Sequence, residues 1–112
     1  MRVSRCFEQM ADAQSGGVNL QFAWDDDKAA SNLEKHGVSF EEAAIVLRDP
    51  FALIFGDEAH SIEERREIII GHSTRNRLLL VCFTERGDTL RLFSARPATR
   101  KERQDYERHS NL

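Results

Sequence analysis

Several features that mark common classes of protein are scarce or absent in this sequence. Only two of its 112 residues are cysteine, and Cys82 lies inside an apolar run, so we expect no disulfide framework. The longest apolar stretch, residues 78–83, is far too short to cross a bilayer. No apolar run follows Arg2 and Arg5, as it would in a signal peptide. These absences predict a protein of the reducing cytoplasm.

Motifs for much of enzyme chemistry are missing as well. There is no glycine-rich phosphate loop, and no Ser/His/Asp arrangement with recognisable flanking sequence. The histidines show no metal-ligand spacing with one another or with the cysteines; they are His36, His60, His72 and His109. We therefore expect neither a metal centre nor a cofactor.

What the sequence does have is enough apolar content for one core, and an uneven distribution of charge. Hydrophobic residues make up 40% of the chain and include seven phenylalanines, which suits one compact domain. Residues 1–64 carry five basic and thirteen acidic side chains, a net charge of -8, whereas residues 65–112 carry eleven and six, a net charge of +5. The basic half predicts a surface that meets a polyanion or an acidic partner. A dipolar surface without a partner is the plainer alternative.

The sequence pattern divides the chain into a short N-terminal extension and one domain. Residues 1–19 show neither a helical nor a strand period and contain Gly16 and Gly17, which predicts a flexible N-terminal extension that the fold does not need. Residues 20–112 then form a single domain, which opens with a short strand at residues 20–24.

Two helices are expected next. Asp25 is a good N-cap for the first helix, and Gly37 provides the left-handed residue that ends it. Ser39 and Glu42 have the spacing of a capping box, which opens a second helix that ends before Pro50.

The rest of the chain has the pattern of strands and one helix. Every residue of 78–83 is apolar, which indicates a strand covered on both faces, and a charged helix is expected at residues 98–109. The strand-forming runs, the last three of them separated by short polar turns, are 51–55, 66–72, 77–84 and 89–95. The predicted fold class is therefore α+β, with two N-terminal helices, an antiparallel β-meander and a C-terminal helix.

Basic side chains on the first helix are candidate site residues. Lys28 and Lys35 are seven residues apart, so they point within roughly 20° of each other, and Asn32 lies between them on the same side. His36 lies at the edge of the neighbouring apolar face. In the alternative interpretation both lysines are ordinary solvated side chains and His36 caps the end of the helix.

A second group of basic candidates lies in the strands. Arg66 has the parity of Ile68, so both point to one face of the sheet. Arg91 and Arg96 have opposite parity and face opposite ways unless a β-bulge intervenes. We favour Arg96 for a site, because a site can open to solvent at the end of a strand. The alternative for Arg96 is a salt bridge to Glu102 of the final helix.

Ordered pieces of sequence between residues 20 and 108 form a recognisable set. They are Phe22-Ala23-Trp24-Asp25, Lys28, Asn32, the run Lys35-His36-Gly37-Val38-Ser39-Phe40-Glu41-Glu42-Ala43, Asp49-Pro50, Glu64 with Arg66, Ile70-Gly71, Thr84-Glu85-Arg86-Gly87, Ser94-Ala95-Arg96, Ala98, Glu102-Arg103 and Tyr106. Together they resemble the BrnT family of ribonuclease toxins. Residues 1–19 fall outside this resemblance.

The resemblance implies a RelE-like fold, an endoribonuclease that inhibits translation, and an antitoxin of the BrnA type that neutralises it. The complex would contact DNA through the antitoxin, with a homodimer possible inside the complex. In metal-free RNA cleavage the ribose 2′-hydroxyl attacks the adjacent phosphate, arginine stabilises the charge that develops, and lysine or histidine transfers protons. The resemblance therefore singles out Lys28, His36, Arg66 and Arg96 as catalytic candidates, and Lys35, Arg77, Arg91 and Tyr106 as substrate-binding ones.

A competing interpretation belongs to another class of function. The same basic residues suit a non-catalytic module that binds the antitoxin and tunes transcriptional autoregulation, because an acidic protein segment and an RNA phosphate offer arginine similar partners.

Overall fold

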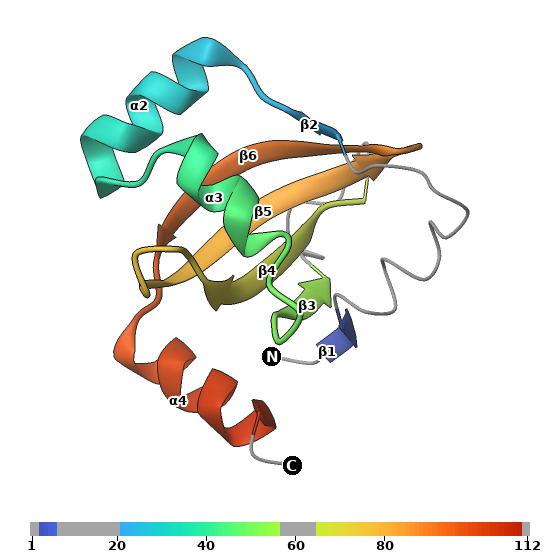
Figure 1. Cartoon of the computed structure of the whole chain (residues 1–112), viewed down its shortest axis with the longest axis vertical. Helices are drawn as coiled ribbons and strands as arrows, with labels where there is room; N and C mark the ends of the chain where they lie inside the picture. The colour runs from blue at the N-terminus through green and yellow to red at the C-terminus, as the bar shows by residue number, and fades with distance from the viewer. Residues whose placement is uncertain (1–2, 7–20, 57–64, 111–112) are drawn as a thin grey trace.

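The computed structural model describes residues 3–6, 21–56 and 65–110, and it confirms the α+β class (Figure 1). The helices are α2 (Asp26–His36), α3 (Phe40–Val46) and α4 (Arg100–Ser110). The strands are β1 (Val3–Cys6), β2 (Gln21–Ala23), β3 (Leu53–Gly56), β4 (Glu67–His72), β5 (Leu78–Arg86) and β6 (Thr89–Pro97). Within these ranges, no helix is long and apolar enough to cross a membrane.

All six of these strands belong to one sheet, in the order β1-β3-β4-β5-β6-β2. Strands β3 to β6 pair antiparallel with their neighbours, which confirms the predicted meander. The sheet as a whole is mixed, because the predicted first strand, β2, pairs with β6 in parallel. Two helices and three strands separate β2 from β6 in the chain, so no tight turn forces these two strands to run in opposite directions.

The outer strand β1 lies in a segment where the sequence predicted no strand. It pairs antiparallel with β3, with Cys6 opposite Leu53. Four residues are too few to show a period, and the pairing arises because the edge of β3 offers unpaired backbone N–H and C=O groups. The expectation for residues 7–19 lies outside the described residues, and the boundary of the domain stays a prediction.

Helix α2 begins and ends where its sequence predicts. The carboxylate of the N-cap Asp25 accepts a hydrogen bond from the Lys28 backbone N–H at 3.0 Å. At the other end, Gly37 has a φ of 68° and donates its N–H to the Leu33 carbonyl. Because glycine adopts this left-handed conformation without strain, α2 stops here and the chain turns directly into α3.

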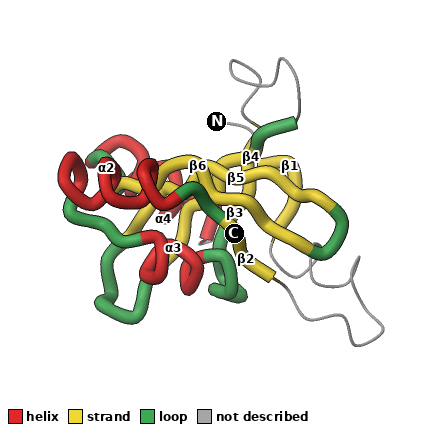
Figure 2. The backbone as a smooth tube through the Cα atoms, turned by 90° about the horizontal axis from the view of Figure 1, so that it is seen from above, coloured by secondary structure: helices red, strands yellow, loops and turns green. Residues whose placement is uncertain are grey.

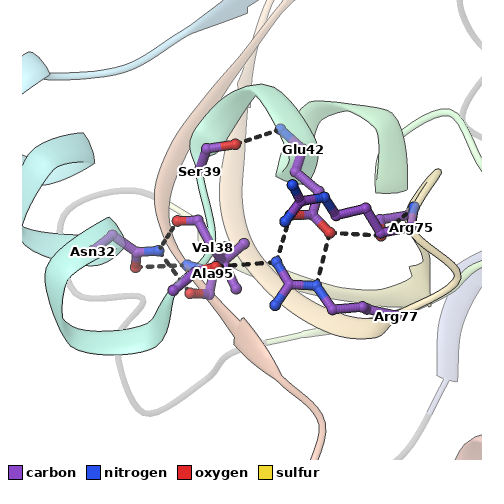
Figure 3. Close-up of polar contacts among 9 residues, drawn as sticks. Asn32, Val38, Ser39, Glu42, Arg75, Arg77 and Ala95 are labelled. Atoms are coloured by element: carbon purple, nitrogen blue, oxygen red, sulfur yellow. Dashed lines mark hydrogen bonds and ion pairs between the residues drawn. The ribbon is translucent and has the colours of Figure 1, made fainter.

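Helix α3 opens with only half of the predicted capping box. The hydroxyl of Ser39 accepts from the Glu42 N–H at 3.1 Å, as expected. The Glu42 carboxylate, however, accepts a hydrogen bond from the Ser73 hydroxyl at 2.7 Å. It also accepts one from Arg77 Nε at 3.0 Å (Figure 3). These bonds, above all the one from Arg77, hold the pKa of Glu42 below its usual value. The carboxylate therefore ties α3 to the β4–β5 hairpin, which compensates for its burial.

Helices cover both faces of the sheet, so its central strand is buried on two sides. On one face, Leu79 and Val81 of β5 pack in a core that includes residues of α3 such as Phe40, and Figure 2 shows α3 along this side of the strands. On the other face, Leu78 and Leu80 pack in a smaller cluster with Tyr106 of α4. The prediction of a doubly covered strand is confirmed. The pattern ends at the half-buried Cys82, where the second face is left open.

Gly71 of β4 lies where a side chain has no room, which gives a test of the packing between sheet and loop. A Cβ built there would stand 2.9 Å from Ala52 Cβ and 2.9 Å from Asp49 Oδ2. That carboxylate accepts the His72 N–H at 2.8 Å, so the loop cannot shift without losing a hydrogen bond. We expect Gly71→Ala to lower the free energy of unfolding by about 1–3 kcal/mol in a denaturant titration.

The matched control for this substitution is Gly56→Ala, because a Cβ at Gly56 meets nothing within 4 Å. It should leave stability close to that of the wild type. Equal effects of the two substitutions would contradict the packing argument.

Candidate functional site

A cavity of about 310 Å³ opens on the part of the sheet that α4 leaves uncovered. Its floor comes from three neighbouring strands, β4, β5 and β6, and Lys28 reaches it from the first turn of α2. The lining residues are Lys28, Arg66, Ile68, Leu80, Cys82, Phe93, Ser94 and Arg96. Three cations therefore meet in one cavity, from α2, from the residue before β4 and from β6, and we call this cavity the basic pocket.

A β-bulge in β6 shapes the basic pocket. Cys82 of β5 pairs with Ser94, but the next residue of β5, Phe83, pairs with Leu92, which leaves Phe93 without a partner across the ladder. Phe93 and Ser94 then both line the pocket, although they are adjacent in sequence. A bulge has this effect because its extra residue breaks the alternation of faces.

The bulge also changes the relation between the two arginines of β6. Arg96 pairs with Leu80 and Arg91 pairs with Thr84, and these two β5 residues lie on the same face of the sheet. The sequence predicted opposite faces for these two arginines unless a β-bulge intervenes. The bulge is present, so Arg91 and Arg96 share a face. Arg96 lines the basic pocket, whereas Arg91 does not.

Two of the three cations lie over the ring of Phe93. The Arg66 guanidinium carbon lies 4.1 Å from the ring centroid, and Lys28 Nζ lies 5.3 Å from it. Each cation is attracted by the ring quadrupole, which offsets part of the repulsion between the two like charges. A pocket built in this way attracts anions.

The third cation, Arg96, is held in place by α4. Its two terminal nitrogens donate to the two oxygens of Glu102 at 2.8 and 2.7 Å, and one of them also donates to the Pro97 carbonyl at 3.2 Å. Glu102 accepts the Thr99 N–H at 2.8 Å while the Thr99 hydroxyl accepts the Glu102 N–H, which completes a capping box at the start of α4. The predicted alternative, a salt bridge from Arg96 to the final helix, is present, and it lies inside the pocket wall.

This pairing shifts the pKa values of both Arg96 and Glu102. The Arg96 guanidinium lowers the pKa of Glu102 to about 2, against the opposing effect of burial. The Glu102 carboxylate in turn raises the pKa of Arg96. Both groups therefore stay charged across the physiological range.

The remaining candidates from the sequence do not line the basic pocket. Lys35 and His36 are exposed in the last turn of α2. Arg77 points to the other face, where it pairs with Glu42 and donates to the Gly37 carbonyl at 3.0 Å. Tyr106 is only 7% exposed and packs edge-on against the His72 ring at 5.5 Å. Arg77 and Tyr106 thus make contacts within the fold and lie outside the basic pocket, and their roles in substrate binding stay predictions.

The pocket also contains residues that sequence reasoning missed. Strict alternation places Phe93 on the face opposite Arg96, so parity alone does not show that a bulge brings both residues to one cavity. The spacing of Leu90, Leu92 and Ala95 carried a signal, since all three are buried on the same side but the last interval is three residues instead of two. Among the described residues, no group of three or more His, Cys, Asp or Glu side chains could hold a metal ion.

Comparison with known proteins agrees with this geometry. Residues 24–102, which include the whole lining of the basic pocket, match a family model of ribonuclease toxins from type II toxin–antitoxin systems. The family described by that model is BrnT, and the chain belongs to it. A toxin of this kind has an antitoxin as its partner. No curated protein matches the sequence.

A solved structure supports the same assignment. The chain is similar to the crystal structure of the Brucella abortus ribonuclease toxin BrnT, with 26% sequence identity and a TM-score of 0.58. The alignment covers 73% of this chain and 100% of that one. The resemblance seen in the sequence is therefore confirmed at the level of family and fold.

The ion pair between Arg96 and Glu102 predicts a pH dependence of stability. The pKa of Glu102 is lowered from 4.5 to about 2 in the folded chain, so the stabilisation is fully present above pH 4.5 and is lost as the pH falls toward 2. After allowance for solvent screening at Arg96, which is 39% exposed, we expect a loss of about 1–2 kcal/mol. As the pH is lowered from 4.5 toward 2, the thermal unfolding temperature of the wild type should therefore fall more steeply than that of Glu102→Gln. Glu107→Gln, on an exposed position of the same helix, is the control and should follow the wild type. Parallel curves for the wild type and Glu102→Gln would contradict the assignment.

Proposed function

We propose that the basic pocket is the active site of a metal-independent endoribonuclease. The observation that carries the proposal is the convergence of Lys28, Arg66 and Arg96 in a single cavity around Phe93. An RNA phosphodiester offers what such a cavity favours, which is a compact anion whose charge increases in the transition state. Membership of a ribonuclease toxin family supports the same reaction class.

In the proposed reaction the ribose 2′-oxygen forms a bond to phosphorus while the bond from phosphorus to the 5′-oxygen breaks. The products are a 2′,3′-cyclic phosphate and a free 5′-hydroxyl. The proton of the 2′-hydroxyl passes to solvent, and the ammonium group of Lys28 protonates the leaving 5′-oxygen. Arg66 and Arg96 stabilise the negative charge that develops on the phosphate oxygens.

Arg96 can take part while it remains paired with Glu102. A guanidinium group has five N–H donors, and three of these are used in the bonds to Glu102 and Pro97. Two donors remain for a phosphate. The carboxylate therefore fixes the orientation of the guanidinium without using all its donors, which suits a group that must be in position before the reaction.

The position of His36 supports a catalytic role less well than the sequence motif indicated. It is exposed at the far end of α2 and does not line the pocket, two turns from Lys28. We therefore assign proton transfer to Lys28 in place of His36. Lys35 and Arg91 remain candidates for contacts with RNA outside the pocket.

The proposed partner is an antitoxin of the BrnA type whose acidic or amphipathic segment covers the basic pocket. Family membership implies an antitoxin, and the three converging cations favour an acidic segment at this place. In this proposal the toxin acts in the cytoplasm, and the complex with its antitoxin contacts DNA.

The first test is the cleavage of a short labelled RNA by purified variants. We expect Arg96→Ala and Arg66→Ala to lower kcat by roughly 10²–10³-fold, as the loss of a transition-state donor does. Arg96→Lys should retain more activity than Arg96→Ala, because lysine keeps the charge but not the fork. Lys28→Ala should cost about a hundredfold or more.

Controls separate mechanism from folding. Lys101→Gln removes an exposed cation of α4 outside the pocket and should cleave like the wild type. A 2′-deoxy substitution at the cleavage site should abolish the reaction, and EDTA should not change it. Folded Arg66→Ala and Arg96→Ala proteins with wild-type rates would remove the pocket from catalysis. Absence of cleavage by the folded wild type itself would favour the non-catalytic, antitoxin-binding interpretation. Activity that EDTA abolishes and a divalent ion restores would refute the metal-free mechanism.

A second test concerns the antitoxin. Lys28→Glu and Arg66→Glu should slow association with the co-purified antitoxin by about tenfold at low salt, and by less at high salt, because charge steering is screened. Lys101→Glu is the matched charge reversal outside the pocket. Stopped-flow mixing at two ionic strengths measures these rates. Association that is equally fast for all three variants would place the antitoxin on another surface.

A further inference from the structure

The amide of Asn32 joins α2 to the sheet beside the basic pocket. Asn32 is only 6% exposed, and its side chain makes three hydrogen bonds. Its Nδ2 donates to the Val38 carbonyl at 3.0 Å and to the Ala95 carbonyl at 2.7 Å, while its Oδ1 accepts the Ala95 N–H at 3.0 Å (Figure 3). The amide therefore binds both backbone groups of one residue of β6, as a residue of a neighbouring strand would.

These bonds lie on the outer edge of β6, where no described strand pairs with it. Strand β2 pairs with β6 only as far as Ala23, which lies opposite Arg91. At Ala95 the outer edge of β6 would expose its N–H and C=O groups, and a buried group of this kind needs a partner. Asn32 supplies that partner from a helix, which fixes the position of α2 along β6.

The fixed position has a direct consequence for Lys28. Lys28 precedes Asn32 by four residues, so the two side chains lie one above the other on the same side of α2. On β6, Phe93 precedes Ala95 by two residues, and Lys28 Nζ lies 5.3 Å from its ring centroid. Moving α2 by one turn along β6 would carry the ammonium group about 5 Å away from the ring.

We propose that Asn32 is a positioning residue of the basic pocket: it sets the register between α2 and β6 and so holds the Lys28 ammonium group over Phe93. The cleavage part of its test rests on the function proposed above, but the geometric part does not. Asn32 contacts neither RNA nor antitoxin in this role. Its effect on the reaction passes through Lys28.

Two substitutions break the contact. Asn32→Asp keeps the shape of the side chain but replaces the two donated hydrogen bonds by an oxygen facing two carbonyl oxygens. In Asn32→Ser the side chain is too short to bind Ala95 and Val38 together. This variant tests the role of Asn32 if the aspartate variant does not fold. Glu42→Gln is the matched control, because it weakens another buried polar network, which ties α3 to the β4–β5 hairpin outside the pocket.

The geometric readout is the NMR chemical shift of the Lys28 side-chain methylene protons. A lysine held over an aromatic ring shows upfield ring-current shifts, and Phe93→Leu gives the reference without the ring. We expect both Asn32 variants to lose at least half of this shift, and Glu42→Gln to retain it. The readout needs no enzymatic activity, so it stands even if the wild type cleaves no RNA.

The kinetic readout uses the same proteins. A misplaced catalytic group costs on the order of a hundredfold in rate, so kcat should fall by about 10–100-fold in the Asn32 variants, with KM changed less than about threefold. In a Lys28→Ala background the Asn32 substitutions should add less than about threefold. A folded Asn32 variant with the wild-type ring-current shift would overturn the proposal. Equal losses in the Asn32 and Glu42 variants would overturn it as well, by showing a general effect of stability.

Discussion

The single extra residue in β6 is the constraint on which the basic pocket depends. Without the bulge, strict alternation would put Phe93 on the face opposite Ser94 and Arg96, so the ring and these two residues could not line one cavity. With the bulge, the half-buried aromatic ring lies on the open face, where it contacts two cations from segments far apart in the chain. Lys28 and Arg66 are therefore brought together by a local irregularity of one strand.

Two carboxylates occupy the same position in two helices but have different consequences. Glu42 of α3 and Glu102 of α4 are each the third residue after a Ser or Thr N-cap, and each pairs with an arginine, Arg77 from the β4–β5 turn and Arg96 from β6. Glu42 is drawn away from its own helix and binds Arg77, so that arginine is used for structure. Glu102 caps its own helix and binds Arg96 at the wall of a cavity, so that arginine is oriented and keeps two donors. The same sequence motif thus serves packing on one face of the sheet and the candidate site on the other.

How much of this the sequence could predict depends on the range of the interaction. Short-range signals were sufficient for α2, whose ends follow from Asp25 and Gly37, and for the meander, whose strands follow from apolar runs. The pairing of Arg96 with Glu102 could be anticipated because the two residues are six apart. The pairing of Glu42 with Arg77 joins residues 35 apart, and nothing local indicates it. The candidate site was predicted as a set of cations, but its aromatic centre required knowledge of the register between β5 and β6.

The amide that fastens α2 to β6 also bears on how the protein behaves beside other copies of itself. An open strand edge is a template onto which a strand from another molecule can add, and such addition leads to aggregates. At Ala95 both backbone groups that would direct this addition are already bound by Asn32. A single side chain thereby closes a stretch of sheet edge that the short strand β2 does not reach, so the sheet is protected against uncontrolled growth at that point without an additional strand.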